Sequence, residues 1–215
     1  MGNLKTYEKK EGFTMGIRVR FLLCIFLICS MESAMAVKRE HSKEERKIMN
    51  QSVNDIVTIF EKEMKDQFGL MCTSLGGGMA YDVDEIGIGF LLNQQTSIEE
   101  ARELEIRATE RFVELINTNE SIKPYLRDPP WNQNRARVRI TFYNEYGEDY
   151  PEGVRLILQA HETVFYFGPK KTPKEVGITI KEEPYAEAKA FVENNPSCLK
   201  PIEKAQKKKK WFGWF

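Results

Sequence analysis

The sequence is poor in the residues that form most catalytic and metal centres. Among its 215 residues it has only two histidines, His41 and His161, and four cysteines. The two histidines lie too far apart in the sequence to form a short-spaced metal cluster. The chain also contains neither GxGxxG nor GxxxxGK(S/T), the glycine motifs that bind dinucleotides and nucleotide phosphates. We therefore expect no metal and no cofactor, and the sequence shows no recognisable catalytic set.

Long hydrophobic runs are missing too, apart from one apolar segment at 21–31. Arg18 and Arg20 precede this segment and a small-x-small triplet at 34–36 follows it, which is the arrangement of a secretory signal peptide. A membrane-spanning helix needs about 20 apolar residues, so an uncleaved anchor is the weaker alternative. We expect cleavage before Val37 and a periplasmic or secreted protein.

Few cysteines remain after such a cleavage. It would remove Cys24 and Cys29 and leave Cys72 and Cys198. In an oxidising compartment these two cysteines can form a disulfide, and the alternative is two free thiols. Cys72 with His161 could form a nucleophile and its base, but no flanking motif supports this pair, and an inert Cys72 is the favoured interpretation.

The charges are unevenly distributed, although they sum to zero over the whole chain. Residues 37–203 carry 22 basic and 29 acidic residues, whereas residues 204–215 carry five lysines and no acidic residue. Binding to nucleic acid rests on many contacts from lysine and arginine to phosphate, which here would have to overcome an acidic body. A nucleic-acid partner is therefore disfavoured.

The last ten residues, QKKKKWFGWF, combine a lysine run with aromatic side chains. Lysines attract anionic lipid headgroups, and tryptophan rings favour the membrane interface. We expect this tail to dock at an anionic membrane surface; a flexible terminus and a protein-binding motif are the alternatives. The residues assigned to docking are Lys207, Lys208, Lys209, Lys210, Trp211, Phe212, Trp214 and Phe215.

Two long amphipathic helices are predicted from their start signals and apolar spacing. Ser42 with Glu45, and Ser97 with Glu100, form capping boxes, and apolar residues then recur at spacings of three and four. Strand-like segments follow, and Pro184 suits the start of a last helix that runs to about residue 194. The predicted strands cover 84–92, 135–143, 154–161 and 163–167, with a short edge strand at 177–181.

This order, α-β-α-β-β-β-α, predicts a single α+β domain over residues 37–200. We expect a mainly antiparallel sheet of about four strands with the two long amphipathic helices packed on it. Residues 1–36 are assigned to an N-terminal extension and signal peptide, and residues 201–215 to the basic and aromatic tail.

Three consecutive glycines at 76–78 invite comparison with phosphate-binding loops. Such loops leave a strand and enter a helix, whereas this segment leaves the first predicted helix and enters the first predicted strand. We therefore expect these glycines to form a tight or closely packed reversal of the backbone.

The segments LGGGMA at 75–80, EEARELEIRATERFVELIN at 99–117 and NTNESIKPYL at 117–126 occur together in this order. In this combination the chain resembles a family of small exported bacterial proteins of uncharacterised function. The resemblance covers residues 45–168 and implies an exported single domain. It assigns no activity and no catalytic residue to any position.

One face of the predicted sheet is rich in arginine. The strand at 135–143 alternates apolar and polar residues, so its three arginines share a face. The same alternation in the next strand points Val154, Leu156 and Leu158 inward. The predicted outward cluster is Arg135, Arg137, Arg139, Arg155, Gln159 and His161, beside Glu85, Gly87 and Gly89 of the first strand.

Such a face suits an anionic ligand or an acidic segment of a partner protein, because guanidinium groups pair with carboxylates and phosphates. The alternative is that the arginines pair with neighbouring acids of the same sheet. Asp82, Asp84 and Glu85 could hold calcium, but a solvated turn is favoured because the EF-hand spacing is absent. We expect an exported, non-enzymatic binding or interaction protein, with an exported hydrolase or transferase as the alternative.

Overall fold

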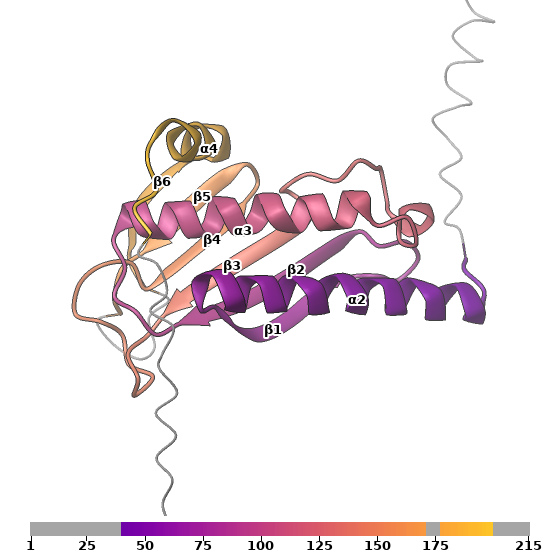
Figure 1. Cartoon of the computed structure of the whole chain (residues 1–215), viewed down its shortest axis with the longest axis horizontal. Coiled ribbons are helices and arrows are strands. Elements are labelled where there is room, and N and C mark those ends of the chain that lie inside the picture. Colours follow the sequence, from indigo (N-terminus) through magenta and orange to yellow (C-terminus); the bar gives the residue numbers. More distant parts are fainter. Residues whose placement is uncertain (1–39, 171–176, 200–215) are drawn as a thin grey trace, which may run out of the picture. The chain divides into compact units, whose positions relative to one another are not determined.

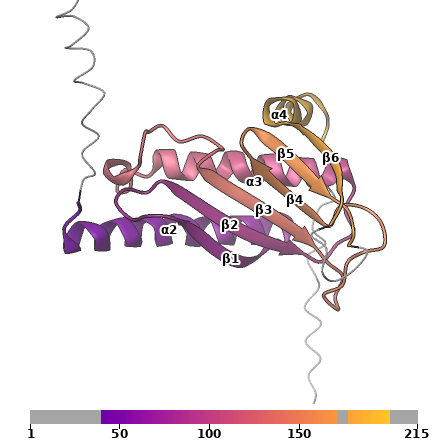
Figure 2. The ribbon, with the colours of Figure 1, turned by 180° about the vertical axis from the view of Figure 1, so that it is seen from behind.

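The computed structural model describes residues 40–170 and 177–199. These residues form a six-stranded mixed sheet, with α2 (Lys43–Phe68) and α3 (Ile98–Thr118) side by side across one face (Figure 1). The reverse view shows the opposite face, which no α-helix of the described residues covers (Figure 2). The predicted signal peptide and C-terminal tail lie outside the described residues. Within those residues, no helix has the length and apolar character needed to cross a membrane.

The remaining elements of the described chain belong to the sheet and its borders. α2 leads into β1 (Met71–Gly78) and β2 (Glu85–Leu92), and after α3 a short 3-10 helix (Lys123–Tyr125) precedes β3 (Ala136–Phe142). The chain then forms β4 (Leu156–Ala160), β5 (Thr163–Phe167), β6 (Thr179–Pro184) and α4 (Tyr185–Asn194), which packs against α3, β5 and β6.

Both long helices begin at the predicted capping boxes. The Ser42 hydroxyl accepts a hydrogen bond from the backbone N–H of Glu45, and the Glu45 carboxylate accepts one from the backbone N–H of Ser42. Ser97 and Glu100 form the same pair at the start of α3. α2 ends at Gly69, whose left-handed φ of 71° suits glycine. Both capping boxes and the end of α2 are therefore confirmed. They could be predicted because each capping signal lies within a few residues of sequence.

The core lies between the helices and the sheet. Phe60 of α2 stacks on Phe112 of α3, with 4.5 Å between ring centroids, and meets Phe90 of β2 edge-on at 5.5 Å. All three rings are buried. Complete burial of such a side chain stabilises by about 1.5–3 kcal/mol, so this trio contributes strongly to holding both helices on the sheet.

The strands lie in the sheet in their sequence order, β1-β2-β3-β4-β5-β6. Every neighbouring pair is antiparallel except β2 and β3, which are parallel and joined through α3. The α+β class is therefore confirmed. The expectation of about four mainly antiparallel strands is corrected to six strands in a mixed sheet, because β1 gave no strand signal and alternation alone does not reveal the direction of pairing.

The glycine segment is the main correction to the predicted order of elements. Gly76, Gly77 and Gly78 end β1, and residues 79–84 make the reversal into β2. β1 is an edge strand that is exposed at seven of its eight residues, so it shows no apolar alternation. Close packing does occur at Gly77, where a Cβ would lie 2.2 Å from the Glu85 carbonyl oxygen.

Candidate ligand-binding site on the open face of the sheet

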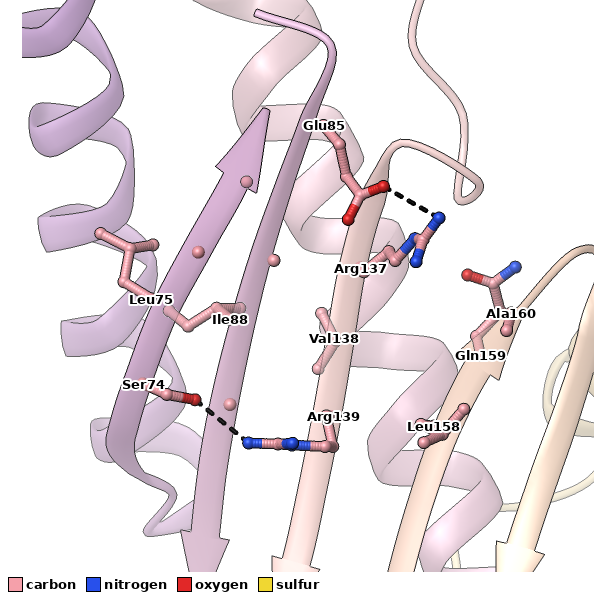
Figure 3. A pocket seen from close by; sticks show the side chains of 14 residues that line it. Ser74, Leu75, Glu85, Ile88, Arg137, Val138, Arg139, Leu158, Gln159 and Ala160 are labelled. Carbon is pink, nitrogen blue, oxygen red and sulfur yellow. Dashed lines mark hydrogen bonds and ion pairs between the residues drawn. The ribbon is translucent and has the colours of Figure 1, made fainter. Parts of the chain in front are cut away.

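The face of the sheet opposite α2 and α3, here called the open face, contains a hollow of about 430 Å³ (Figure 3). Arg137 and Arg139 of β3 and Leu158 of β4 lie along it, and backbone from two glycine-rich strands forms its floor. The floor glycines are Gly76 and Gly77 of β1 and Gly87 and Gly89 of β2. A hollow of this volume is in the range of small-ligand sites.

Arg139 is the exposed cation of this hollow. Its guanidinium lies across β2 and donates a hydrogen bond from Nη2 to Ser74 Oγ of β1 at 3.3 Å. Gly89 makes this path available, because a Cβ there would lie 2.3 Å from Ser74 Oγ and 3.1 Å from Arg139 Nη2. Within residues 40–170 and 177–199, no carboxylate forms an ion pair with Arg139. The guanidinium can therefore accept an external anion.

The other two predicted arginines of this strand are paired with acids. Arg137 Nη2 lies 2.8 Å from Glu85 Oε2, beside the hollow. Arg135 lies just before β3, and its guanidinium contacts Asp84 at 2.6 Å and Asp128 at 2.8 Å. The alternative of pairing within the sheet therefore holds for Arg135 and Arg137.

The predicted alternation of β4 is wrong. Ile157 and Gln159 face the helices, whereas Leu156, Leu158 and Ala160 lie on the open face. The register between β3 and β4 shows this, because Ile157 pairs with the buried Ile140 of β3 and paired residues share a face. Apolar residues occupy both faces of this strand, so alternation alone could not choose between them.

The other three members of the predicted cluster are not exposed side by side with Arg139 on the open face, although Arg155 and Gln159 each line a hollow that borders it. Arg155 is buried, with Nε 3.9 Å from the Asp149 carboxylate. Gln159 is buried as well, and its Nε2 donates a hydrogen bond to Asn134 Oδ1 at 3.0 Å. His161 lies in the turn between β4 and β5 with a φ of 48°. From the predicted cluster, Arg137, Arg139 and Gln159 line the larger hollow, and Arg155 lines a second hollow that also borders Arg139. His161 lines neither of them.

A second hollow of about 340 Å³ also borders Arg139 on the open face. Leu91 of β2 and Leu156 of β4 supply apolar side chains to it, and Thr73 and Thr141 supply hydroxyl-bearing ones. Arg139 thus borders two hollows. One has a glycine floor, and the other is lined by leucine and threonine side chains and by Arg155.

The predicted alternative of a Cys72–His161 pair is not formed. Cys72 lies on β1 and His161 after β4, so β2 and β3 separate them. Partial burial, followed by the nearby Glu61 carboxylate, raises the pKa of the Cys72 thiol to about 11. At neutral pH this thiol is protonated and therefore a weak nucleophile.

The two cysteines of the described chain are also not joined to each other. Cys72 lies on β1 and Cys198 follows α4, and both are free thiols. The backbone N–H and the thiol of Cys198 contact Glu103 Oε2 of α3 at 2.8 and 3.1 Å.

The acidic cluster before β2 is held by cations and donors of the protein itself. Asp82 forms a hydrogen bond with His41 Nε2 at 2.9 Å, and Asp84 pairs with Arg127 at 3.2 Å as well as with Arg135. In the described ranges, no group of three or more histidine, cysteine or acidic side chains is arranged to hold a metal ion.

Ser74 and Leu158 are site residues that the sequence analysis missed. Ser74 escaped because β1 lacks the alternation that marks a strand, and Leu158 was assigned to the opposite face. No local pattern in residues 71–80 marks a strand, because three of these residues are glycine, which is depleted in strands.

Comparisons with protein-family models, with curated proteins and with solved structures found no match for this chain. The resemblance to small exported bacterial proteins described above rests on the three sequence segments alone.

Proposed function

We propose that the protein is an exported, non-enzymatic binding protein that holds an anionic ligand at Arg139. One observation carries this proposal: an exposed guanidinium, fixed by Ser74, borders two hollows and has no carboxylate partner in the described chain. Guanidinium groups form strong charge-assisted hydrogen bonds with carboxylates and phosphates. The ligand therefore carries one of these groups.

The floor of the hollow suggests the rest of the ligand. Backbone at glycine positions presents a surface without side chains, on which a planar group can lie in close contact. Leu158 adds an apolar contact at the border. A planar carboxylate such as benzoate matches both features, and the acidic side chain of a partner segment presents the same carboxylate chemistry to Arg139.

Titration calorimetry with benzoate, inorganic phosphate and a five-residue glutamate peptide tests this proposal. We expect at least one of the three to bind, and Arg139→Gln to weaken that binding by at least about tenfold, the equivalent of one charge-assisted hydrogen bond. Arg107→Gln is the matched control, because it removes the same charge from an exposed position on α3. Absence of binding by all three probes, or equal weakening by both variants, would contradict the proposal.

A hydrolase or transferase is the second candidate for this face. Such an enzyme needs a nucleophile or a general base at the hollow. Ser74 is the hydroxyl nucleophile among the residues that line the larger hollow, and its Oγ accepts a hydrogen bond from Arg139. Glu85 is the one carboxylate there and is engaged by Arg137, and no histidine is among these lining residues. This arrangement favours binding over catalysis.

We also propose that the chain is exported and cleaved before Val37, because the apolar segment at 21–31 has the flanks of a signal peptide. N-terminal sequencing of the protein from its native cell tests this directly. A mature chain that still contains residues 21–31 would contradict cleavage.

A further inference from the structure

β1 is a sheet edge without the usual protection against further pairing. Its sequence, MCTSLGGG, contains no charged residue and no proline. It forms one border of the sheet (Figure 2). Seven of its eight residues are exposed. Natural proteins usually protect such an edge with lysine, proline or a covering element. A bulge between Cys72 and Ser74 interrupts only the start of the strand, so Ser74–Gly78 stays regular.

The opposite edge of the same sheet is protected. β6 has the sequence TIKEEP, with three charged residues and a terminal proline. α4 begins directly after Pro184 and packs on β5 and β6. The two edges of one sheet therefore differ in the features that prevent strand addition. This difference points to β1 as the edge that accepts another strand.

We propose that β1 pairs antiparallel with β1 of a second copy of this chain, in the register that places Leu75 opposite Leu75. Leu75 lies near the middle of the strand and is 50 % exposed. Pairing about this residue buries the largest apolar side chain in the regular part of the strand against itself. The proposal does not depend on the ligand assigned to Arg139.

Self-pairing fits this edge because, in a two-fold interface, the side chains of β1 in one copy face the side chains of β1 in the other copy. Every residue of β1 is uncharged, so no like charges meet along the strand. Beside β1, α2 presents both signs of charge, with Glu61, Lys62 and Lys65 near Met71 and Cys72. A second copy therefore finds opposite charges as well as like charges on this flank.

The dimer would contain one continuous sheet, and its two-fold axis would be perpendicular to the plane of that sheet. Both sets of helices would then lie on one side, and both open faces on the other. The larger hollow of each copy includes Gly76 of β1. In the dimer, the larger hollows of the two copies would therefore lie on the same face, one on either side of the seam.

Sedimentation velocity of the full chain, with two lysine variants, tests the dimer. We expect a concentration-dependent dimer, and Leu75→Lys to weaken it by at least about tenfold, because two like charges would face each other at the seam. Ile180→Lys is the matched control: Ile180 is 46 % exposed on the protected edge strand, and its substitution should leave the dimer unchanged. A monomer at every concentration, or equal effects of both variants, would overturn the proposal.

Disulfide trapping gives a readout that does not depend on a loss of association. In a chain whose four native cysteines are replaced by serine, Leu75→Cys should form a disulfide-linked dimer on mild oxidation. Ile180→Cys in the same background should not. Circular dichroism establishes that both variants are folded. If the two variants cross-link equally, or if only Ile180→Cys does so, β1 is not the seam.

Discussion

Arg139 and Ser74 are joined by a hydrogen bond of 3.3 Å although their strands are not neighbours in the sheet. The bond crosses β2 at Gly89, where a side chain would collide with both partners. The Arg139 guanidinium can therefore lie across β2 in the candidate site because Gly89 has no side chain.

Gly89→Ala should break this bond with little loss of stability. The added Cβ would lie 2.3 Å from Ser74 Oγ, and both Ser74 and Arg139 are exposed side chains that can move away. We expect the free energy of unfolding to change by no more than about 0.5 kcal/mol, and anion binding at Arg139 to weaken. Gly87→Ala is the control on the same strand and face, since the nearest atom to its Cβ is 3.9 Å away. Calorimetry with the anionic probe that binds the native chain measures the difference, and equal binding by both variants would contradict the role of Gly89.

Glu105 should make the protein less stable as the pH rises. Its carboxyl is fully buried, and burial raises its pKa well above 4.5 although the Thr109 hydroxyl and the Gln159 backbone favour the charged form. A raised pKa means that the folded state keeps a proton that the unfolded state has released. Stability from this group is therefore complete below about pH 4.5 and declines above it by up to about 1.4 kcal/mol per pH unit.

Glu105→Gln should remove this part of the pH dependence. The variant should gain stability over the native chain between pH 5 and pH 8 and show little difference near pH 4, as measured by urea unfolding across this range. Glu99→Gln, at an exposed position on the same helix, is the control and should leave the profile unchanged. If the stability of Glu105→Gln declines between pH 5 and pH 8 as steeply as that of the native chain, Glu105 is not the source of the pH dependence.

Arg102 should be costly to remove because it neutralises a nearly buried carboxylate. Its Nε lies 2.6 Å from Glu183 Oε1, Tyr166 hydrogen-bonds the same carboxylate, and the Phe191 ring lies 4.2 Å from the guanidinium carbon. Burial acts to raise the pKa of Glu183, but hydrogen bonds from Arg102, Tyr166 and Lys181 bring it below its usual value. Arg102→Met should lower the free energy of unfolding by about 1–3 kcal/mol, because Lys181 Nζ, 2.9 Å from Glu183 Oε2, still pairs with the carboxylate.

The double variant Arg102→Met with Glu183→Gln should recover part of that loss, because it no longer leaves the Glu183 carboxylate with Lys181 in place of two cations. Chemical unfolding of the two singles and the double gives the coupling energy. If the double variant is as unstable as the sum of the singles, the two residues act independently and the ion pair is not the cause. Stability from Glu183 should also decline as the pH falls through its lowered pKa.

The C-terminal tail should bind anionic membranes. Four successive lysines contribute about 1 kcal/mol each near an anionic surface, and the aromatic residues at 211–215 add burial at the interface. Full-length protein should sediment with vesicles that contain phosphatidylserine and should be partly released by high salt. A chain cut after Ala205 should remain in solution, and equal sedimentation of both chains would exclude the tail as the anchor.

The sequence predicted the helices better than the sheet. The capping boxes at Ser42 and Ser97 are local signals, so both long helices were placed correctly. Leu156 and Leu158 were assigned to the wrong face because β4 is apolar on both sides, and only its register with β3 shows which side meets the core. Ser74 could not be placed beside Arg139, since their contact depends on the parallel pairing of β2 with β3.

This parallel pairing also affects when the candidate site can form during folding. β1 and β2 are joined by a short turn, but β2 meets β3 only after α3 and the segment that follows it have crossed the sheet. Contacts between distant parts of a chain form more slowly than local ones, because a long loop must first be closed. The hollow takes its glycine floor from β1 and β2 and its arginines from β3. An incompletely folded chain that has only the β1–β2 hairpin would therefore lack the site, and anion binding would distinguish finished molecules from folding intermediates.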